Sequence, residues 1–287
     1  MKLYLSFHNP HLRDSFNYVT KTNLLNNGSC HSLSCTTDRK EERDGILFPS
    51  GYDYCYEYQE AKDKDRVYII ALSDPDDLNF HKGIVSLTSD AINAYQKADV
   101  LLVYSEEQRT FLTLAGFAKE KIEIIPLEAT YDNTRILESE RKSFRSFYQI
   151  PYDRKLILLL GNDFNRNDIK KMEELAMLSP EKCFLCFGRM DMASIKEKRR
   201  EMLGFSTNIR FFDVIPEELY RSATLTSDCI LLYSNPLCPP PVLYDFHVGN
   251  SKIVSYTKTG YNRELLQKMD AQFIKDFPSL HHYISSL

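Results

Sequence analysis

The sequence predicts an α/β protein built on parallel sheets that helices cover on both faces. Short, almost uninterrupted apolar runs recur along the chain, for example at 67–72 and 100–104. Strands of this kind are typical of sheets buried on both faces, which are usually parallel. Helical patterns lie between several of the runs, and this alternation indicates α/β architecture. A chain of 287 residues is long enough for about two such domains.

The first elements follow in order from their local patterns. A strand is expected at 3–7 and a helix at 12–25, which ends at Asn27-Gly28, a favourable C-cap. Residues 30–35 alternate weakly and suggest a second strand. Four tyrosines at every second position of 52–58 would share one face of a strand. Such a stripe either stacks a sugar or packs in a half-buried hairpin.

The later elements continue the same rhythm. Ser105 and Gln108 match the Ser-x-x-Gln pattern of a capping box, so a helix is expected from there to Ala115. Pro216 opens another helix, since proline is favourable in a first turn. Further strands are expected at 122–125, 156–160, 183–187, 209–212, 229–233 and 253–255. The break at Pro151 separates a first domain from a second.

Composition narrows the class of protein. The net charge of −4 argues against a nucleic-acid binder, which would show a strong basic excess. The seven cysteines are odd in number and no secretory leader is expected before them, so reduced thiols in a cytoplasmic protein are the simplest interpretation. No stretch approaches 18 apolar residues, and no transmembrane helix is expected. The Cys-x-x-Cys at 183–186 lies inside an apolar strand, which favours buried structural thiols.

Two stretches of the chain together carry a family pattern. The first comprises Ala98–Arg109, Leu114–Gly116 and Lys121–Pro126. The second comprises Ile150–Gly161, Phe184–Gly188, Asn208–Leu219, Thr226–Ser234 and Gly249–Ser255. In order and spacing they resemble the nucleotide-sugar glycosyltransferases of the GT-B fold, family 4 in particular. The resemblance covers roughly residues 98–255.

The resemblance implies two Rossmann-like domains that face a central cleft. Residues 1–135 would form the acceptor domain and 136–150 the linker. Residues 151–265 would form the nucleotide-sugar domain, and 266–287 a terminal helix that packs back on the first domain. The implied reaction moves a sugar from a nucleoside-diphosphate sugar to a sugar, glycolipid or protein acceptor, with retention of configuration and without a metal or further cofactor.

Donor contacts are expected after the first strand of the second domain. The family has a basic residue there and a Lys about five residues later, whereas this chain has Gly161-Asn162 and then Asn167. Arg166 is the candidate that would grip the phosphates bidentately, with Lys170 as the second cation. The alternative is a surface arginine on a loop.

The family's pair of glutamates is altered in this chain. The ribose-binding Glu falls on Tyr244, and Asp245, one residue later, is the candidate replacement. The other Glu falls on Pro236, and nothing replaces it. The run Pro239–Pro241 has no backbone N–H to offer a donor. These departures keep a second hypothesis open: a catalytically degenerate GT-B protein that binds or stabilises a partner.

Two further sites are expected from the sequence. Asp74 and His81 follow the strand at 67–72, where either could orient an acceptor hydroxyl; the alternative is a polar turn capped by Asp. Arg141–Tyr148 mixes basic and aromatic residues near the hinge, a composition that suits peripheral docking on a membrane surface.

Overall fold

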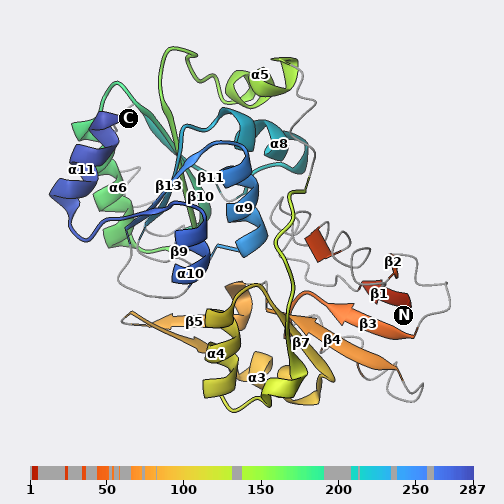
Figure 1. Cartoon of the computed structure of the whole chain (residues 1–287). Coiled ribbons are helices and arrows are strands. Elements are labelled where there is room, and N and C mark those ends of the chain that lie inside the picture. The colour runs from red at the N-terminus through yellow and green to blue at the C-terminus, as the bar shows by residue number, and fades with distance from the viewer. Residues whose placement is uncertain are drawn as a thin grey trace. The chain divides into compact units, whose positions relative to one another are not determined.

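The computed structural model describes residues 2–5, 23–24, 34–36, 44–51, 54, 58, 66–72, 75–81, 83–130, 138–190, 208–212, 214–233, 238–256 and 262–287 (Figure 1). The chain divides into two compact units. The first comprises Met1–Thr130, Pro239–Tyr244 and Thr259–Leu265, and the second comprises Tyr131–Cys238, Asp245–Lys258 and Leu266–Leu287. The expected helix at 12–25 lies outside the described residues, apart from 23–24.

The first unit is built on a six-stranded parallel sheet in the order β2-β1-β3-β4-β7-β8. Its strands are β1 (Lys2–Leu5), β2 (Ser34–Thr36), β3 (Gly45–Phe48), β4 (Val67–Ala71), β7 (Val100–Val103) and β8 (Ile122–Ile124). The side chains of Ile46 and Ile70 are fully buried, as the apolar runs predict for a sheet covered on both faces. When the strands of this sheet are numbered along the chain, β7 is the fifth and β8 the sixth. The first five then have the doubly wound order 2-1-3-4-5.

A separate antiparallel hairpin and several helices lie in the same unit, between the strands of its sheet along the chain. The hairpin pairs β5 (Leu78–His81) with β6 (Ile84–Leu87) after the 3₁₀ turn η2 (Pro75–Asp77). The helices are α3 (Ser89–Lys97), α4 (Glu106–Leu114) and the 3₁₀ turn η3 (Lys119–Lys121). The predicted cap of α4 is confirmed, because the Ser105 hydroxyl accepts the Gln108 N–H at 3.1 Å. The Gln108 side chain accepts the N–H of Tyr104 instead of closing the box on Ser105.

The second unit is built on another six-stranded parallel sheet, in the order β11-β10-β9-β12-β13-β14. Its strands are β9 (Leu156–Phe164), β10 (Cys183–Met190), β11 (Ile209–Phe212), β12 (Cys229–Tyr233), β13 (Lys252–Tyr256) and β14 (Gln272–Phe273). Numbered within the unit, this is the order 3-2-1-4-5-6 of Rossmann dinucleotide-binding domains. The predicted parallel α/β architecture is confirmed.

The described helices of the second half are α5 (Glu138–Phe147), α6 (Arg166–Leu178), α8 (Glu217–Thr226), α9 (Pro240–Val248), α10 (Arg263–Lys268) and α11 (Phe277–Ser286). Met172 and Leu175 of α6 lie in one buried cluster with Leu280 and Ile284 of α11, all at 0% exposure. The structure thus gives the terminal helix a place in the core of the second unit. Apolar residues four positions apart on α11 account for this burial.

The expected linker at 136–150 is largely a helix of the second unit. Helix α5 occupies Glu138–Phe147, and its Phe144 is fully buried. The Phe144 N–H donates to the hydroxyl of Ser222 on α8 at 2.9 Å. The many charged residues of α5 suggested a linker, but Phe144 and Arg145 are buried and only the other charged side chains cover its outer face.

Candidate functional site

The topology of the second unit marks one place for a ligand. In open parallel sheets, ligands bind at the carboxyl ends of the strands, where the strand order reverses. Here the order reverses between β9 and β12, which pair in parallel register with Leu159 beside Leu231. The carboxyl end of β9 leads into α6, and β12 precedes α9. The end of β9 and the N-terminus of α6, both in the second unit, therefore define the candidate site.

The end of β9 is shaped by glycines that pack against the chain itself. Strand β9 extends to Phe164, so Gly161 and Asn162 lie within the strand and not in the loop expected after it. A Cβ on Gly161 would meet the Phe164 ring at 2.6 Å, and one on Gly188 of β10 would overlap the Gly161 carbonyl oxygen. The pairing of β9 and β10 shifts register at this point. These glycines therefore serve strand packing.

The N-terminus of α6 is capped by its own residues. The Asn165 side-chain oxygen accepts the N–H groups of Asn167 at 2.9 Å and Asp168 at 3.1 Å, and the Asp168 carboxylate accepts the Asn165 N–H at 3.2 Å. This is a complete capping box. Asp168 is 7% exposed and supplies the negative charge that a helix N-terminus favours. A bound phosphate would share this helix end with an internal carboxylate.

Arg166 and Lys170 add positive charge to the same helix end. Arg166 is the first residue of α6, and Lys170 lies one turn later on the same helix face. Both side chains are exposed. A cation at a helix N-terminus opposes the helix dipole, so Arg166 has this position at some cost to the helix. The structure thus keeps the two predicted cations together.

The N-terminus of α9 offers no N–H donor in its first two positions. Helix α9 begins at Pro240, one residue before the expected first helical residue Pro241. The next N–H groups, of Val242 and Leu243, donate to the Pro239 carbonyl at 3.0 and 3.3 Å. An anion at this helix end would therefore find no proline amide to bind.

Asp245, the candidate ribose ligand, is turned inward in α9. Its carboxylate is 1% exposed and accepts the Tyr220 hydroxyl at 3.3 Å. Tyr244, the preceding residue, is half-buried. A ribose hydroxyl would have to reach a carboxylate that already has a protein partner.

One of the two predicted acceptor residues, His81, lies in the described part of the first unit. Asp74 lies outside the described residues, while His81 is exposed at the end of β5, in the hairpin and not on the parallel sheet. Their neighbour Asp77 is 1% exposed and accepts the Tyr95 hydroxyl at 2.7 Å and the Gly51 N–H. Asp77 thus has a structural role.

The described cysteines do not form a reactive or metal-binding site. Cys183 and Cys186 are buried within β10. Burial raises the pKa of the Cys186 thiol well above its usual value and that of Cys229 to about 12, so both stay protonated near neutral pH. Within the described residues, no group of three His, Cys, Asp or Glu side chains could hold a metal ion.

The opposite edge of the same sheet holds a network that sequence reasoning missed. Arg145 of α5 donates to the Thr226 hydroxyl at 2.7 Å, to two carbonyls before β9 at 2.9 Å, and to the Asp228 carboxylate at 3.2 Å. Asp228 also pairs with Lys155 at 2.8 Å and accepts the Leu156 N–H. These partners lie up to 83 residues from Arg145 in the chain, and no local pattern marks them.

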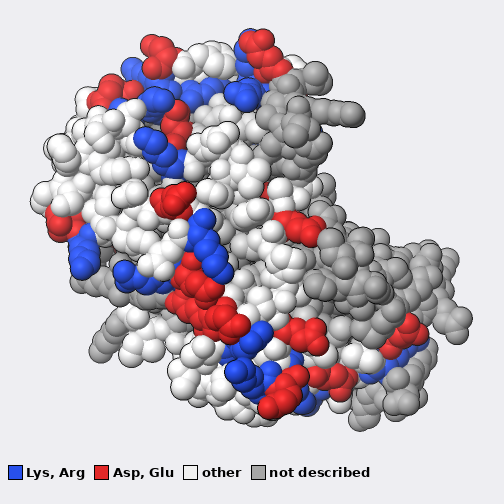
Figure 2. Space-filling model, viewed as in Figure 1, with Lys and Arg blue, Asp and Glu red and all other residues white. Residues whose placement is uncertain are grey.

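The surface charges are mixed in sign. Figure 2 shows acidic and basic side chains interspersed over the described part of the face in view. In the described residues, no helix combines the length and the apolar character needed to span a bilayer.

Neither a protein-family model nor a curated protein sequence matches the chain. Solved structures do match. WaaG, a glycosyltransferase involved in lipopolysaccharide biosynthesis, is 15% identical over 100% of this chain and 90% of its own, with a TM-score of 0.60. HepE from Anabaena, solved with UDP-glucose, is 11% identical over 99% of this chain and 88% of its own, with a TM-score of 0.64.

A UDP-N-acetylglucosamine 2-epimerase from Rickettsia bellii shares the architecture with a different activity. It is 14% identical over 88% of this chain and 78% of its own, with a TM-score of 0.53. At such identities the similarity shows the fold alone, and fold does not fix function. Together with the two Rossmann-type sheets, the matches to glycosyltransferase structures establish that this chain has the GT-B fold.

Proposed function

We propose that the chain is a glycosyltransferase that binds a nucleoside-diphosphate sugar at the carboxyl edge of the second sheet. The observation that carries the proposal is the pair of exposed cations, Arg166 and Lys170, on the first turns of α6, directly after the strand at which the order reverses. The GT-B fold over the whole chain supports it, and solved proteins of this fold include one with bound UDP-glucose. The donor would be held mainly by side-chain charge.

The chemistry follows from the leaving group. A nucleoside diphosphate gains negative charge as the sugar leaves it, and Arg166 would stabilise that charge with a bidentate grip while Lys170 adds a second cation. Positioning and charge stabilisation would carry the reaction, with retention of configuration and without a bound metal. Asp74 or His81 would orient the hydroxyl of a sugar, glycolipid or protein acceptor. We place this reaction in the cytoplasm, with the membrane surface as a further possibility for α5.

Three observations favour a second candidate, a GT-B protein that binds a partner without turning over a donor. The N-terminus of α9 lacks proline N–H groups, Asp245 is buried against Tyr220, and Asn165 and Asp168 already occupy the N-terminus of α6. Each removes a contact that a donor would use. Binding and turnover must therefore be measured separately.

The test uses calorimetry with UDP-, GDP- and CMP-linked sugars, followed by an assay of sugar release. We expect one nucleotide class to bind, and Arg166→Ala to weaken that binding at least about tenfold, because a charge-assisted contact is lost. Lys275→Ala is the control: Lys275 is exposed in the same unit and makes no hydrogen bond or ion pair within the described residues. At about 100 times Kd, the ligand should also add roughly 2.7 kcal/mol to the free energy of unfolding.

The outcomes separate the candidates. Binding that depends on Arg166, together with sugar release or transfer, supports the glycosyltransferase. Binding without any turnover, also with simple glycoside acceptors, supports the non-catalytic candidate. If no nucleotide sugar binds the folded protein, the proposed function is wrong.

A further inference from the structure

A pocket lies at the amino edge of the second sheet, at the opposite ends of the strands from the proposed donor site. Its volume is about 310 Å³, at the small end of the range of roughly 300–1,000 Å³ typical of ligand sites. Lys155 directly precedes β9, Asp228 precedes β12, and Lys252 begins β13, so three adjacent strands bring charged residues to it. Arg141 of α5 lines it as well. All its lining residues belong to the second unit.

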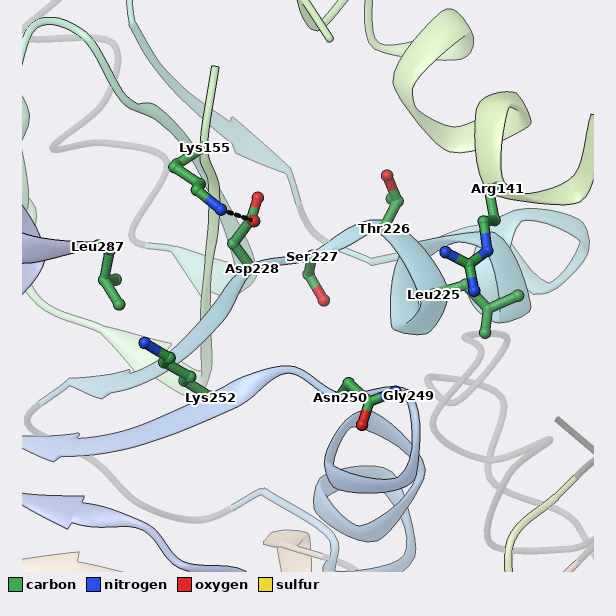
Figure 3. Close-up of a pocket in the computed structure, with 10 residues that line it drawn as sticks. All are labelled: Arg141, Lys155, Leu225, Thr226, Ser227, Asp228, Gly249, Asn250, Lys252 and Leu287. Carbon is green, nitrogen blue, oxygen red and sulfur yellow. Dashed lines mark hydrogen bonds and ion pairs between the residues drawn. The ribbon is translucent and has the colours of Figure 1, made fainter. Parts of the chain in front are cut away.

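Figure 3 shows how the charged side chains surround this pocket. Lys155 and Lys252 lie on one side of the view and Arg141 on the other, with Ser227 and Asn250 between them. The lining side chains therefore carry three positive charges and the single negative charge of Asp228. The net balance favours an anionic ligand.

The pocket's own negative groups are already satisfied. The Asp228 carboxylate accepts hydrogen bonds from the Lys155 ammonium at 2.8 Å, the Arg145 guanidinium at 3.2 Å and the Leu156 N–H at 2.9 Å. Helices α8 and α9 end beside the pocket, and the negative ends of their dipoles attract cations. At the C-terminus of α8 that cation is Arg145, which donates to the Thr226 carbonyl at 3.2 Å. Lys155 and Arg145 therefore already have partners within the protein.

The other two cationic side chains of the pocket are those of Arg141 and Lys252. Within the described residues, neither the Arg141 guanidinium nor the Lys252 ammonium makes a hydrogen bond or an ion pair. Both are exposed, and they come from different elements, α5 and β13. The Ser227 hydroxyl is bonded to that of Ser251 at 2.6 Å, so it is not a free donor for a ligand. Recognition in this pocket would rest on the two charges.

We propose that this pocket binds a small phosphorylated molecule, and that Lys252 and Arg141 turn inward from its opposite sides to hold the phosphate. The guanidinium of Arg141 offers a planar fork for phosphate oxygens, and Lys252 supplies a point charge. The small volume limits the ligand to about the size of a sugar phosphate. Because the pocket is at the amino edge of the sheet, such a ligand would not compete with a donor at α6. The site is independent of the proposed glycosyltransferase activity.

Titration calorimetry at constant ionic strength tests the proposal, with inorganic phosphate, glucose 6-phosphate and glucose as probes. We expect saturable binding of the phosphorylated probes and none of glucose. Arg141→Gln and Lys252→Gln should each weaken phosphate binding about fivefold to tenfold, because each removes one charged contact. Lys275→Gln should leave the affinity unchanged. The variants should fold normally, since the replaced side chains are exposed and unbonded within the described residues.

The probes also identify the source of the phosphate. Tighter binding of glucose 6-phosphate supports a phosphate ester as the ligand, and equal binding supports free phosphate in the same pocket. An absence of saturable phosphate binding would overturn the proposal. So would phosphate binding that survives in Arg141→Gln and Lys252→Gln but is lost in Arg166→Ala, because the anion would then occupy the donor edge.

Discussion

The two edges of the second sheet are built in different ways. At the amino edge, charged side chains from α5, β13 and the segments before β9 and β12 converge, and Arg145, Asp228 and Lys155 form one bonded network. At the carboxyl edge, Gly161 and Gly188 let two strands approach closely, and the N-terminus of α6 is closed by Asn165. The first edge is held by side chains, and the second is held mainly by the backbone.

This difference changes what the carboxyl edge can do. Rossmann-type units usually bind phosphates there through helix N–H groups. In this chain the N–H groups of Asn167 and Asp168 at α6 are used by the cap. The positive charge at this helix end comes from the side chains of Arg166 and Lys170. A ligand at this edge should therefore bind with a strong dependence on salt and on those two residues.

Loss of the amino-edge network should have the largest effect on stability. Arg145→Ala would remove five hydrogen bonds and leave Asp228 with one cation fewer. Breaking a buried ion pair by removing one partner costs about 3–5 kcal/mol. We therefore expect the free energy of unfolding of the variant to fall by about that amount, measured by urea denaturation with circular dichroism.

The matched control for Arg145 lies one turn earlier on the same helix. Arg141→Ala should change the free energy of unfolding by no more than about 0.5 kcal/mol, because Arg141 is exposed and unbonded within the described residues. If Arg145→Ala were as mild as Arg141→Ala, the network would not hold this edge, and the contrast between the two edges would fail.

A substitution at the carboxyl edge should have a somewhat smaller effect. In Gly188→Ala the new methyl group would overlap the Gly161 carbonyl oxygen, and β9 and β10 would have to move apart. Overpacking of this kind typically costs about 1–3 kcal/mol. We expect a loss near the top of that range by thermal and urea unfolding.

Gly83→Ala serves as the comparison for that substitution. Gly83 has a φ of 84°, and a Cβ there would meet no atom within 4 Å. Its cost should therefore be only the left-handed backbone penalty of about 1–2 kcal/mol. A smaller loss for Gly188→Ala than for Gly83→Ala would contradict a close strand contact at Gly188.

The strands that could be predicted from the sequence are those that the structure buries on both faces. Strands β9, β10 and β12 are buried on both faces, so a continuous apolar run was a sufficient signal. The hairpin strand β5 was missed, although Leu78 is buried and Asn79 is exposed in the alternation of a half-buried strand. The tyrosine pattern was misleading: Tyr54 and Tyr58 adopt helical conformation and stack at 4.6 Å, since a spacing of four also suits a helix.

In the candidate site too, features set by neighbouring residues could be predicted from the sequence, and features set by distant residues could not. The cap at Ser105 and the position of Arg166 at the start of a helix depend on neighbours in sequence, and both were predictable. The buried position of Asp245 depends on Tyr220, 25 residues away, and the role of Arg145 depends on Asp228, 83 residues away. Such contacts need the tertiary structure, because one sequence carries no record of which distant residues meet.

The smallest expected effect concerns the cap that closes α6. In Asn165→Ala the N–H groups of Asn167 and Asp168 lose their acceptor. Loss of a helix N-cap costs about 1 kcal/mol, so we expect that decrease in the free energy of unfolding. Asn165→Asp should restore stability to within a few tenths of a kcal/mol, because the carboxylate can accept the same bonds.

The same variant tests how the carboxyl edge holds an anion. Asn165→Ala exposes two N–H groups at the start of α6 without touching Arg166 or Lys170. If side-chain charge holds the donor, affinity for the nucleotide that the wild type binds should stay within about twofold, because the contacts that matter are unchanged. A loss of tenfold or more would instead make Asn165 a ligand contact. The carboxyl edge would then bind its ligand through the cap region, and the contrast with the charge-lined amino edge would no longer hold.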